Sequence, residues 1–271
     1  MTFIYFTHKI NILILLNGKF SKKTFNKKKK RLTQLINYIH SLDEIKVTFE
    51  GDLENSLFLK IRNSYDEAMA QKRKINDFIL NLSGLSGRKF RSMLNNLIEK
   101  YESPRYLEVG SWHGSTACSA CYQNKVKLTC IDNWSQNFIE GKDPEFEFKR
   151  NIKNILNTNS DLTFIKKDFR KVDYADIGKH NIYLYDGPHQ LEDHFDGIKL
   201  VQPALDDEYV LIVDDWNWNQ VRDGTLSAIH HLGLNIISKL EIRTTSDNSS
   251  ALTVGEQSDW HQGCSFFVIN K

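Results

Sequence analysis

The 271-residue sequence lacks any apolar run long enough to cross a membrane. The longest early run, residues 10–16, is interrupted by Asn11 and closed by Asn17, whereas a spanning helix takes about 20 apolar residues. A secretory signal is not recognisable either, because the Lys cluster follows the apolar run and no Ala-x-Ala-like cleavage site appears. We therefore expect no membrane span and no export by that route.

Cysteine is also scarce, and the few cysteines form no recognisable disulfide pattern. A chain of this size with four cysteines does not have a disulfide framework, so we expect a reducing compartment, the cytoplasm. Cys118 and Cys121 have no second Cys pair or His spacing to complete a zinc site. We expect both to be small buried residues of a helix.

Acidic residues are absent from the first 31 positions. This stretch has nine of the 36 Lys and Arg residues and none of the 34 Asp and Glu residues, so the remaining chain has a net charge of −7. An acidic body argues against nucleic-acid binding over a broad surface, although the basic stretch could contact polyanions weakly. We predict that residues 1–31 are a flexible basic leader.

Two regions of different pattern follow this leader. Residues 32–104 have apolar residues at helical spacing, with one short segment at 41–49 that could be extended. From 105 to 271, short apolar runs alternate with helical stretches at 115–122, 144–156, 191–201 and 221–232. The predicted strands are 106–109, 128–131, 162–165, 182–185, 209–213, 236–242 and 266–269.

This alternation predicts an α/β fold. We expect a doubly wound, mostly parallel seven-stranded sheet with helices on both faces, preceded by a mainly helical N-terminal region. With 40% hydrophobic residues, the chain is long enough for one such domain with additions. Ligands of open α/β sheets bind at the carboxyl ends of the strands, so residues at those ends are the candidate site residues.

A glycine turn follows the first of these strands. Glu108 ends the strand, Gly110 and Gly114 allow the backbone to approach a ligand closely, and Ser111 lies between them. Ser115 or Thr116 can cap the helix that follows. The spacing E-x-G-x-x-x-G differs from the dinucleotide pattern, and its acid suits an ammonium or sulfonium group better than a pyrophosphate. The alternative is a turn that serves only strand-to-helix packing.

Acids follow the next two strands as well. Asp132 lies about twenty residues after the glycine turn, where a carboxylate can accept hydrogen bonds from ribose hydroxyls. Asp168 precedes Phe169, and this pair could bind an adenine amino group and cover its ring. An ordinary solvent-facing Asp168 is equally compatible with the sequence.

Three more acids and a histidine end the following two strands. Asp186 and His189 come after one, and Asp214 and Asp215 after the other. Carboxylates this close repel one another unless a cation or a shared proton offsets them. Asp186, Asp214 and Asp215 therefore predict a site for Mg²⁺ or a similar hard divalent cation. A helix-capping role could explain one of these acids but not readily all three.

With these motifs, the chain resembles the S-adenosylmethionine-dependent methyltransferases of the Rossmann-like class. Within that class, the Asp186-Gly187-x-His189 segment and the Asp214-Asp215 pair resemble macrocin O-methyltransferase and related metal-dependent sugar O-methyltransferases. The resemblance covers roughly residues 85–270. It implies that S-adenosylmethionine and Mg²⁺ are the cofactors. The implied cofactor-binding residues are Glu108, Gly110, Ser111, Gly114, Ser115, Asp132, Asp168 and Phe169.

The implied reaction is attack by an acceptor hydroxyl on the cofactor's methyl group. Either His189 or Asp186 could remove the hydroxyl proton, and the sequence does not decide between them. The acceptor would be a small molecule or a glycan, with a sugar, polyol or phenol hydroxyl, and a homo-oligomer is possible. Two alternatives stay open: a dinucleotide-dependent oxidoreductase, which Glu108 and the missing third glycine disfavour, and a catalytically silent binding module.

Overall fold

The computed structural model describes residues 27–33, 45–155 and 160–271. The chain divides into two compact units, residues 1–40 and 41–271, and each is considered by itself. In the first unit, residues 27–33 are helical and mostly exposed. The rest of the predicted leader lies outside the described residues.

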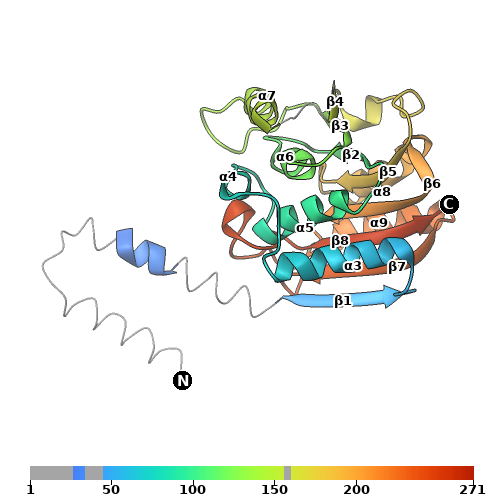
Figure 1. The fold of residues 1–271 in the computed structure, drawn as a ribbon, viewed down its shortest axis with the longest axis horizontal. Helices are drawn as coiled ribbons and strands as arrows, with labels where there is room; N and C mark the ends of the chain where they lie inside the picture. The colour runs from blue at the N-terminus through green and yellow to red at the C-terminus, as the bar shows by residue number, and fades with distance from the viewer. Residues whose placement is uncertain (1–26, 34–44, 156–159) are drawn as a thin grey trace, which may run out of the picture. The chain divides into compact units, whose positions relative to one another are not determined.

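The second unit is built on one mixed sheet (Figure 1). Its order is β1-β7-β8-β6-β5-β2-β3-β4, in which β2 to β6 are parallel to one another, while β8 is antiparallel to β6 and β7, and β1 is antiparallel to β7. The strands are β1 (Lys46–Gly51), β2 (Arg105–Val109), β3 (Lys127–Asp132), β4 (Asp161–Lys166), β5 (His180–Tyr185), β6 (Leu205–Asp214), β7 (Asn235–Arg243) and β8 (Cys264–Asn270).

Helices cover both faces of this sheet, as predicted. One face packs against α3 (Ser56–Met69), α4 (Asp77–Leu80), α5 (Arg88–Glu99), α6 (Ser115–Cys121) and α7 (Pro144–Ile155). The other packs against α8 (Leu191–Leu200) and α9 (Asn219–His231), and short 3₁₀ turns lie at η1 (Phe169–Lys171), η2 (Gln202–Ala204) and η3 (Gly255–Gln257). Cys118 and Cys121 are buried free thiols of α6, which confirms their expected packing role.

The predicted strand number was wrong by one. The described residues contain eight strands, because β1 pairs with the edge of the sheet formed by β7. Its exposed and half-buried side chains are those of an edge strand, and its partner lies almost 200 residues away. The local pattern of a single short strand cannot reveal which sheet it joins. The seven strands predicted after residue 104 are all present.

The two faces of β2 show how the strands place side chains near the site. Tyr106 packs into the core beneath α5 and α6, whereas Leu107 and Val109 belong to the core beneath α8 and α9. The chain then turns at Gly110, above the carboxyl end of the strand. This edge of the sheet carries the site described below.

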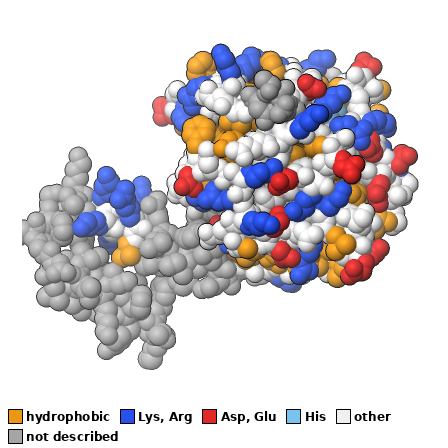
Figure 2. All heavy atoms as spheres, in the orientation of Figure 1, with side chains coloured by type: hydrophobic (Ala, Val, Ile, Leu, Met, Phe, Trp, Pro, Cys, Tyr) orange, Lys and Arg blue, Asp and Glu red, His pale blue; other side chains and the backbone are white. Residues whose placement is uncertain are grey.

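The outer surface of the second unit carries both signs of charge. On the face drawn in Figure 2, Lys and Arg side chains alternate with Asp and Glu, and no broad basic area is visible. In the described part of the chain, no helix combines the length and apolarity needed to cross a bilayer.

Candidate functional site

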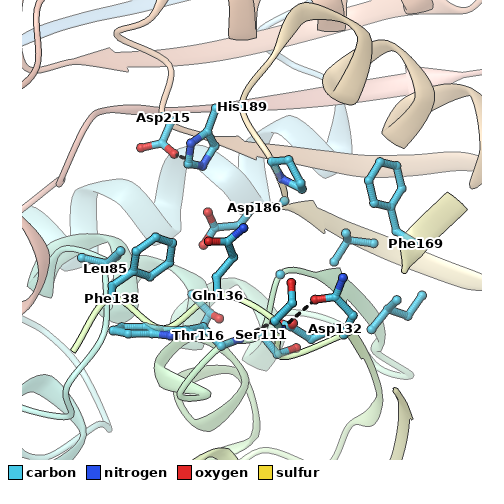
Figure 3. Close-up of a pocket in the computed structure, with 18 of the residues that line it drawn as sticks. Leu85, Ser111, Thr116, Asp132, Gln136, Phe138, Phe169, Asp186, His189 and Asp215 are labelled. Atoms are coloured by element: carbon cyan, nitrogen blue, oxygen red, sulfur yellow. Dashed lines mark hydrogen bonds and ion pairs between the residues drawn. The ribbon is translucent and has the colours of Figure 1, made fainter. Parts of the chain in front are cut away.

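A cavity of about 710 Å³ opens at the carboxyl ends of β2, β3, β5 and β6 (Figure 3). It brings together most of the residues that the sequence singled out. Those that line it are Gly110, Ser111, Ser115, Asp132, Asp168, Phe169, Asp186, His189 and Asp215. Glu108, Gly114 and Asp214 are not among the lining residues.

The glycine turn is shaped by close backbone contact with the end of β5. Gly110 has φ +92°, and a Cβ on it would overlap with the carbonyl oxygen of Asp186. Gly114 has φ +78° and lies against the Phe148 ring, where a Cβ would be 2.8 Å from the ring edge. Only glycine tolerates both the positive φ and the close carbonyl oxygen at position 110. The turn therefore serves packing, and it also brings β2 and β5 together at the cavity.

Glu108 lies beneath this turn and is fully buried. The Tyr106 hydroxyl donates a hydrogen bond to its Oε2 at 2.8 Å, and the Cys130 thiol contacts its Oε1 at 3.6 Å. Burial raises the pKa of Glu108 above its ordinary value, although neighbouring hydrogen-bond donors oppose this shift. Its present contacts are with the protein core.

Asp132 ties the end of β3 to the glycine turn. Its Oδ2 accepts the backbone N–H of Trp112 at 2.7 Å, and its Oδ1 accepts that of Trp134 at 2.6 Å. Burial raises the pKa of Asp132, while these N–H groups lower it. The carboxylate lines the cavity and retains lone pairs for a ligand.

Asp168 and Phe169 lie at one end of the cavity. Asp168 accepts the backbone N–H of Arg170 at 2.9 Å and so caps the short η1 helix. The Phe169 ring is held edge-on by Tyr185, with ring centroids 5.6 Å apart, and the Arg170 guanidinium lies 4.5 Å from its centroid. These contacts fix the orientation of the ring that the sequence associated with an adenine.

His189, Asp215 and Asp186 lie close to one another in the cavity (Figure 3). The His189 Nε2 lies 2.8 Å from Oδ2 of Asp215, and His261 Nε2 lies 3.6 Å from the other carboxylate oxygen. Asp186, His189 and Asp215 each offer one potential metal-ligand atom, and these three atoms lie within 4.8 Å of one another. The arrangement combines a histidine paired with a carboxylate and a second carboxylate.

The charges of this group act on one another. Burial, together with the charges of Asp214 and Asp215, raises the pKa of Asp186 well above its ordinary value. Burial alone lowers the pKa of His189, but the hydrogen bond and negative charge of Asp215 outweigh it, so the net pKa is raised. The same bond lowers the net pKa of Asp215 against the effect of burial. The pairing with His189 therefore favours the charged form of Asp215.

Comparison with known families gives a match to the part of the chain that supplies most of this cavity's lining. Residues 107–216 match the sequence model of a family described as "Methyltransferase domain". The match covers less than half of the chain and includes β3, β4, β5 and β6. No curated protein sequence matches the chain.

Solved structures resemble the chain at low sequence identity. A Streptococcus mutans protein assigned to the SAM-dependent methyltransferases is 15% identical, with a TM-score of 0.47 over 68% of this chain and 48% of that one. TrmN from Thermus thermophilus is 13% identical, with a TM-score of 0.47 over 71% of this chain and 51% of that one. An O-methyltransferase from Bacillus cereus in complex with SAH is 11% identical, with a TM-score of 0.48 over 78% and 91%. The chain thus spans about half the length of the first two proteins.

Two neighbouring acids at the end of β6 take different positions. Asp214 ends β6 and is buried outside the cavity, next to Cys264 in the sheet, and its Oδ2 has no hydrogen-bond partner among the described residues. Asp215 follows the strand with φ +59° and lines the cavity. The left-handed backbone at Asp215 turns its side chain toward His189. Of this pair, only Asp215 reaches the cavity.

Several lining residues carry no motif in the sequence. Leu85, Val254 and His261 come from loops that do not follow the carboxyl ends of the parallel strands, and Phe138 lies several residues beyond the end of β3. Of the two tryptophans that follow Asp215, Trp218 lines the cavity, whereas Trp216 is buried and its indole N–H donates a hydrogen bond to Glu241 at 2.8 Å. No local signal marks such loop residues, because only the tertiary fold brings their segments to the cavity.

Proposed function

We propose that the protein is an S-adenosylmethionine-dependent O-methyltransferase. The observation that carries this proposal is the His189–Asp215 pair, with 2.8 Å between Nε2 and Oδ2, facing the cavity of a methyltransferase domain. A histidine held in this way is a suitable base for an acceptor hydroxyl, which is a poor nucleophile while it keeps its proton.

The cofactor would occupy the part of the cavity nearest the glycine turn. Gly110 and Ser111 would face the methionine portion, and Asp132 would accept from the ribose hydroxyls. Asp168 and Phe169 would bind the adenine, with the fixed Phe169 ring as an apolar wall. All five residues line the one cavity, which supports this assignment.

The proton transfer would use the free nitrogen of His189. Because Asp215 engages Nε2, that nitrogen holds its hydrogen and Nδ1 can accept the acceptor's proton. When bound, S-adenosylmethionine would supply an electrophilic methyl group for the acceptor oxygen, with S-adenosylhomocysteine as the product. Asp215 then stabilises the protonated His189 by its negative charge.

Ligand binding and methyl transfer together test this function. We expect S-adenosylmethionine and S-adenosylhomocysteine to bind the purified chain in calorimetry, and labelled methyl groups to appear on hydroxyl-bearing acceptors. The family match gives no support to an oxidoreductase. Binding of NAD(H) without binding of S-adenosylmethionine would contradict the proposal, and cofactor binding without transfer to any acceptor would favour a silent binding module.

Replacing Asp132 should weaken cofactor binding. We expect Asp132→Ala to lower S-adenosylmethionine affinity about tenfold or more, since a charge-assisted hydrogen bond contributes roughly 1.5 to 3 kcal/mol. Calorimetry gives the affinity. Because Asp132 also holds two backbone N–H groups, the melting temperature without ligand is the control for a disturbed loop. Unchanged affinity would rule out the ribose assignment.

We also propose a divalent cation, Mg²⁺ or a similar ion, beside His189. The carboxylates of Asp186 and Asp215 would hold it, and Asp214, outside the cavity, would not. Two observations support the fit: ligand atoms of this group lie within 4.8 Å, and Oδ1 of Asp215 is buried without a hydrogen-bond partner among the described residues. Mg²⁺ is commonly bound through one or two carboxylates, with water and substrate completing its shell. When bound, such an ion lowers the pKa of a coordinated hydroxyl.

Chelation tests the cation directly. We expect excess EDTA to abolish methyl transfer while S-adenosylhomocysteine affinity changes little, because neither proposed cation ligand, Asp186 or Asp215, is among the residues assigned to the cofactor. Added Mg²⁺ or Mn²⁺ should restore transfer. Full activity in excess chelator would contradict the proposed cation and leave the His189–Asp215 pair as a metal-free base. It would also contradict the proposed similarity to metal-dependent sugar O-methyltransferases.

A further inference from the structure

We infer that Arg91, an arginine buried outside the cavity, is a positioning residue for cofactor binding: through Ser86 it orients the Ser115 hydroxyl as a hydrogen-bond donor to the cofactor. This inference rests on the S-adenosylmethionine-dependent function proposed above. Arg91 lies on α5, before residues 107–216, which match the methyltransferase family, and it is not among the residues that line the cavity. Its role would connect the amino-terminal helices to the cofactor.

Arg91 is a charged side chain with no exposed surface. Its guanidinium donates to four carbonyl oxygens of α4 and the loop that follows, those of Ile79, Leu80, Leu82 and Gly84. A fifth hydrogen bond goes to a serine hydroxyl, so all five acceptors in the described part of the chain are uncharged. Burial lowers the pKa of Arg91 to about 10, which leaves it charged at neutral pH. A buried charge that no acceptor neutralises favours an anionic group nearby.

The loop that Arg91 holds presses on the start of α6. Gly84 leaves no room for a side chain there, because a Cβ would overlap with the Ser115 Oγ. From another side, the Glu256 carboxylate accepts the Gly84 backbone N–H at 3.4 Å. The hydrogen bonds of Arg91 to this loop therefore also fix its position against Ser115, which lines the cavity.

Ser86 joins the guanidinium to the cavity wall. Its Oγ accepts the Nε–H of Arg91 at 2.9 Å and lies 3.0 Å from the Ser115 Oγ. A hydroxyl that accepts from a cation directs its hydrogen away from the positive charge, so Ser86 donates to Ser115. The Ser115 Oγ has no other hydrogen-bond partner among the described residues, which leaves its own hydrogen for a ligand.

This series of donors suits a carboxylate. The charge of Arg91 polarises the Ser86 hydroxyl, which in turn polarises that of Ser115, and such a donor bonds most strongly to an ionised acceptor. Ser115 directly follows the glycine turn, where we propose that the methionine portion of the cofactor lies. Of the charged groups in that portion, only the carboxylate accepts hydrogen bonds, because the ammonium and sulfonium groups have no acceptor oxygen.

Two ligands that differ only in the carboxylate test this role by binding alone. The probes are S-adenosylhomocysteine and its decarboxylated analogue, each titrated by calorimetry into the full chain. We expect Ser115→Ala to weaken S-adenosylhomocysteine binding about tenfold and analogue binding less than about twofold, since the lost contact is a charge-assisted hydrogen bond. A general defect of the cavity would weaken both ligands equally, and that result would overturn the inference.

Ser86→Ala tests the connection to Arg91. We expect it to weaken S-adenosylhomocysteine binding about fivefold, again without effect on the analogue. The double variant with Ser115→Ala should bind no more weakly than Ser115→Ala alone, because Ser86 acts through Ser115. Ser92→Ala is the matched control, since Ser92 is a buried serine of α5 that donates to a backbone carbonyl oxygen and does not line the cavity. Additive losses, or an equal loss in Ser92→Ala, would overturn the inference.

Arg91→Lys completes the series. Lysine keeps the charge but has three N–H donors for five acceptors, so S-adenosylhomocysteine binding should weaken at least as much as in Ser86→Ala, with the analogue again less affected. If this variant does not fold, the two serine variants decide the question. Should the unaltered chain bind neither ligand, the proposed function fails and this inference with it. Binding of both ligands with no difference between the variants would overturn this inference alone.

Discussion

Replacing His189 by Gln should lower kcat by about 10²- to 10⁴-fold, the range typical of losing a general base. Glutamine can keep a polar contact with Asp215 but cannot take the acceptor's proton. The measurement is methyl transfer under saturating S-adenosylmethionine and acceptor. S-adenosylhomocysteine affinity should stay within about twofold, because His189 is not among the residues assigned to the cofactor.

A histidine near the same group provides the control for this variant. His194 is buried behind the cavity, where its Nδ1 contacts the Thr225 hydroxyl at 3.4 Å, and it does not line the cavity. His194→Gln should affect stability more than turnover. A loss below about tenfold for His189→Gln would instead assign proton removal to Asp186 or to another group.

Asp215→Asn should lower kcat by about 10²-fold or more, and Asp214→Asn by less than about tenfold. The amide at position 215 removes the charge that stabilises protonated His189 and a proposed cation ligand. Asparagine also tolerates the left-handed backbone there, so folding should be preserved. Asp214 lies outside the cavity, and its replacement changes volume little.

The comparison of these two neighbours is informative because the substitution is identical and only the side-chain position differs. Cation affinity, measured by Mn²⁺ titration, should fall in Asp215→Asn and Asp186→Asn but not in Asp214→Asn. The opposite ranking of Asp214 and Asp215 would show that the buried carboxylate takes part in the reaction. That result would restore the three-acid site predicted from the sequence.

The sequence by itself determined the parallel core and the edge of the sheet where the site lies. Apolar runs such as 128–131 and 182–185 match β3 and β5, because strands buried on both faces are continuous in hydrophobicity. The carboxyl ends of parallel strands share one edge, so Asp132, Asp186 and Asp215 were expected together and do line one cavity. These inferences needed only local periodicity and chain order.

Only the tertiary structure decided which side chains face the cavity and what surrounds them. Asp214 and Asp215 are equivalent in the sequence, but one continues the strand and the other adopts a left-handed turn toward His189. β1 joined the sheet, and Leu85, Phe138 and Val254 came together, through contacts between segments far apart in the chain. Local periodicity carries no information about such pairings, because their free energy arises from surfaces that exist only once the chain has folded.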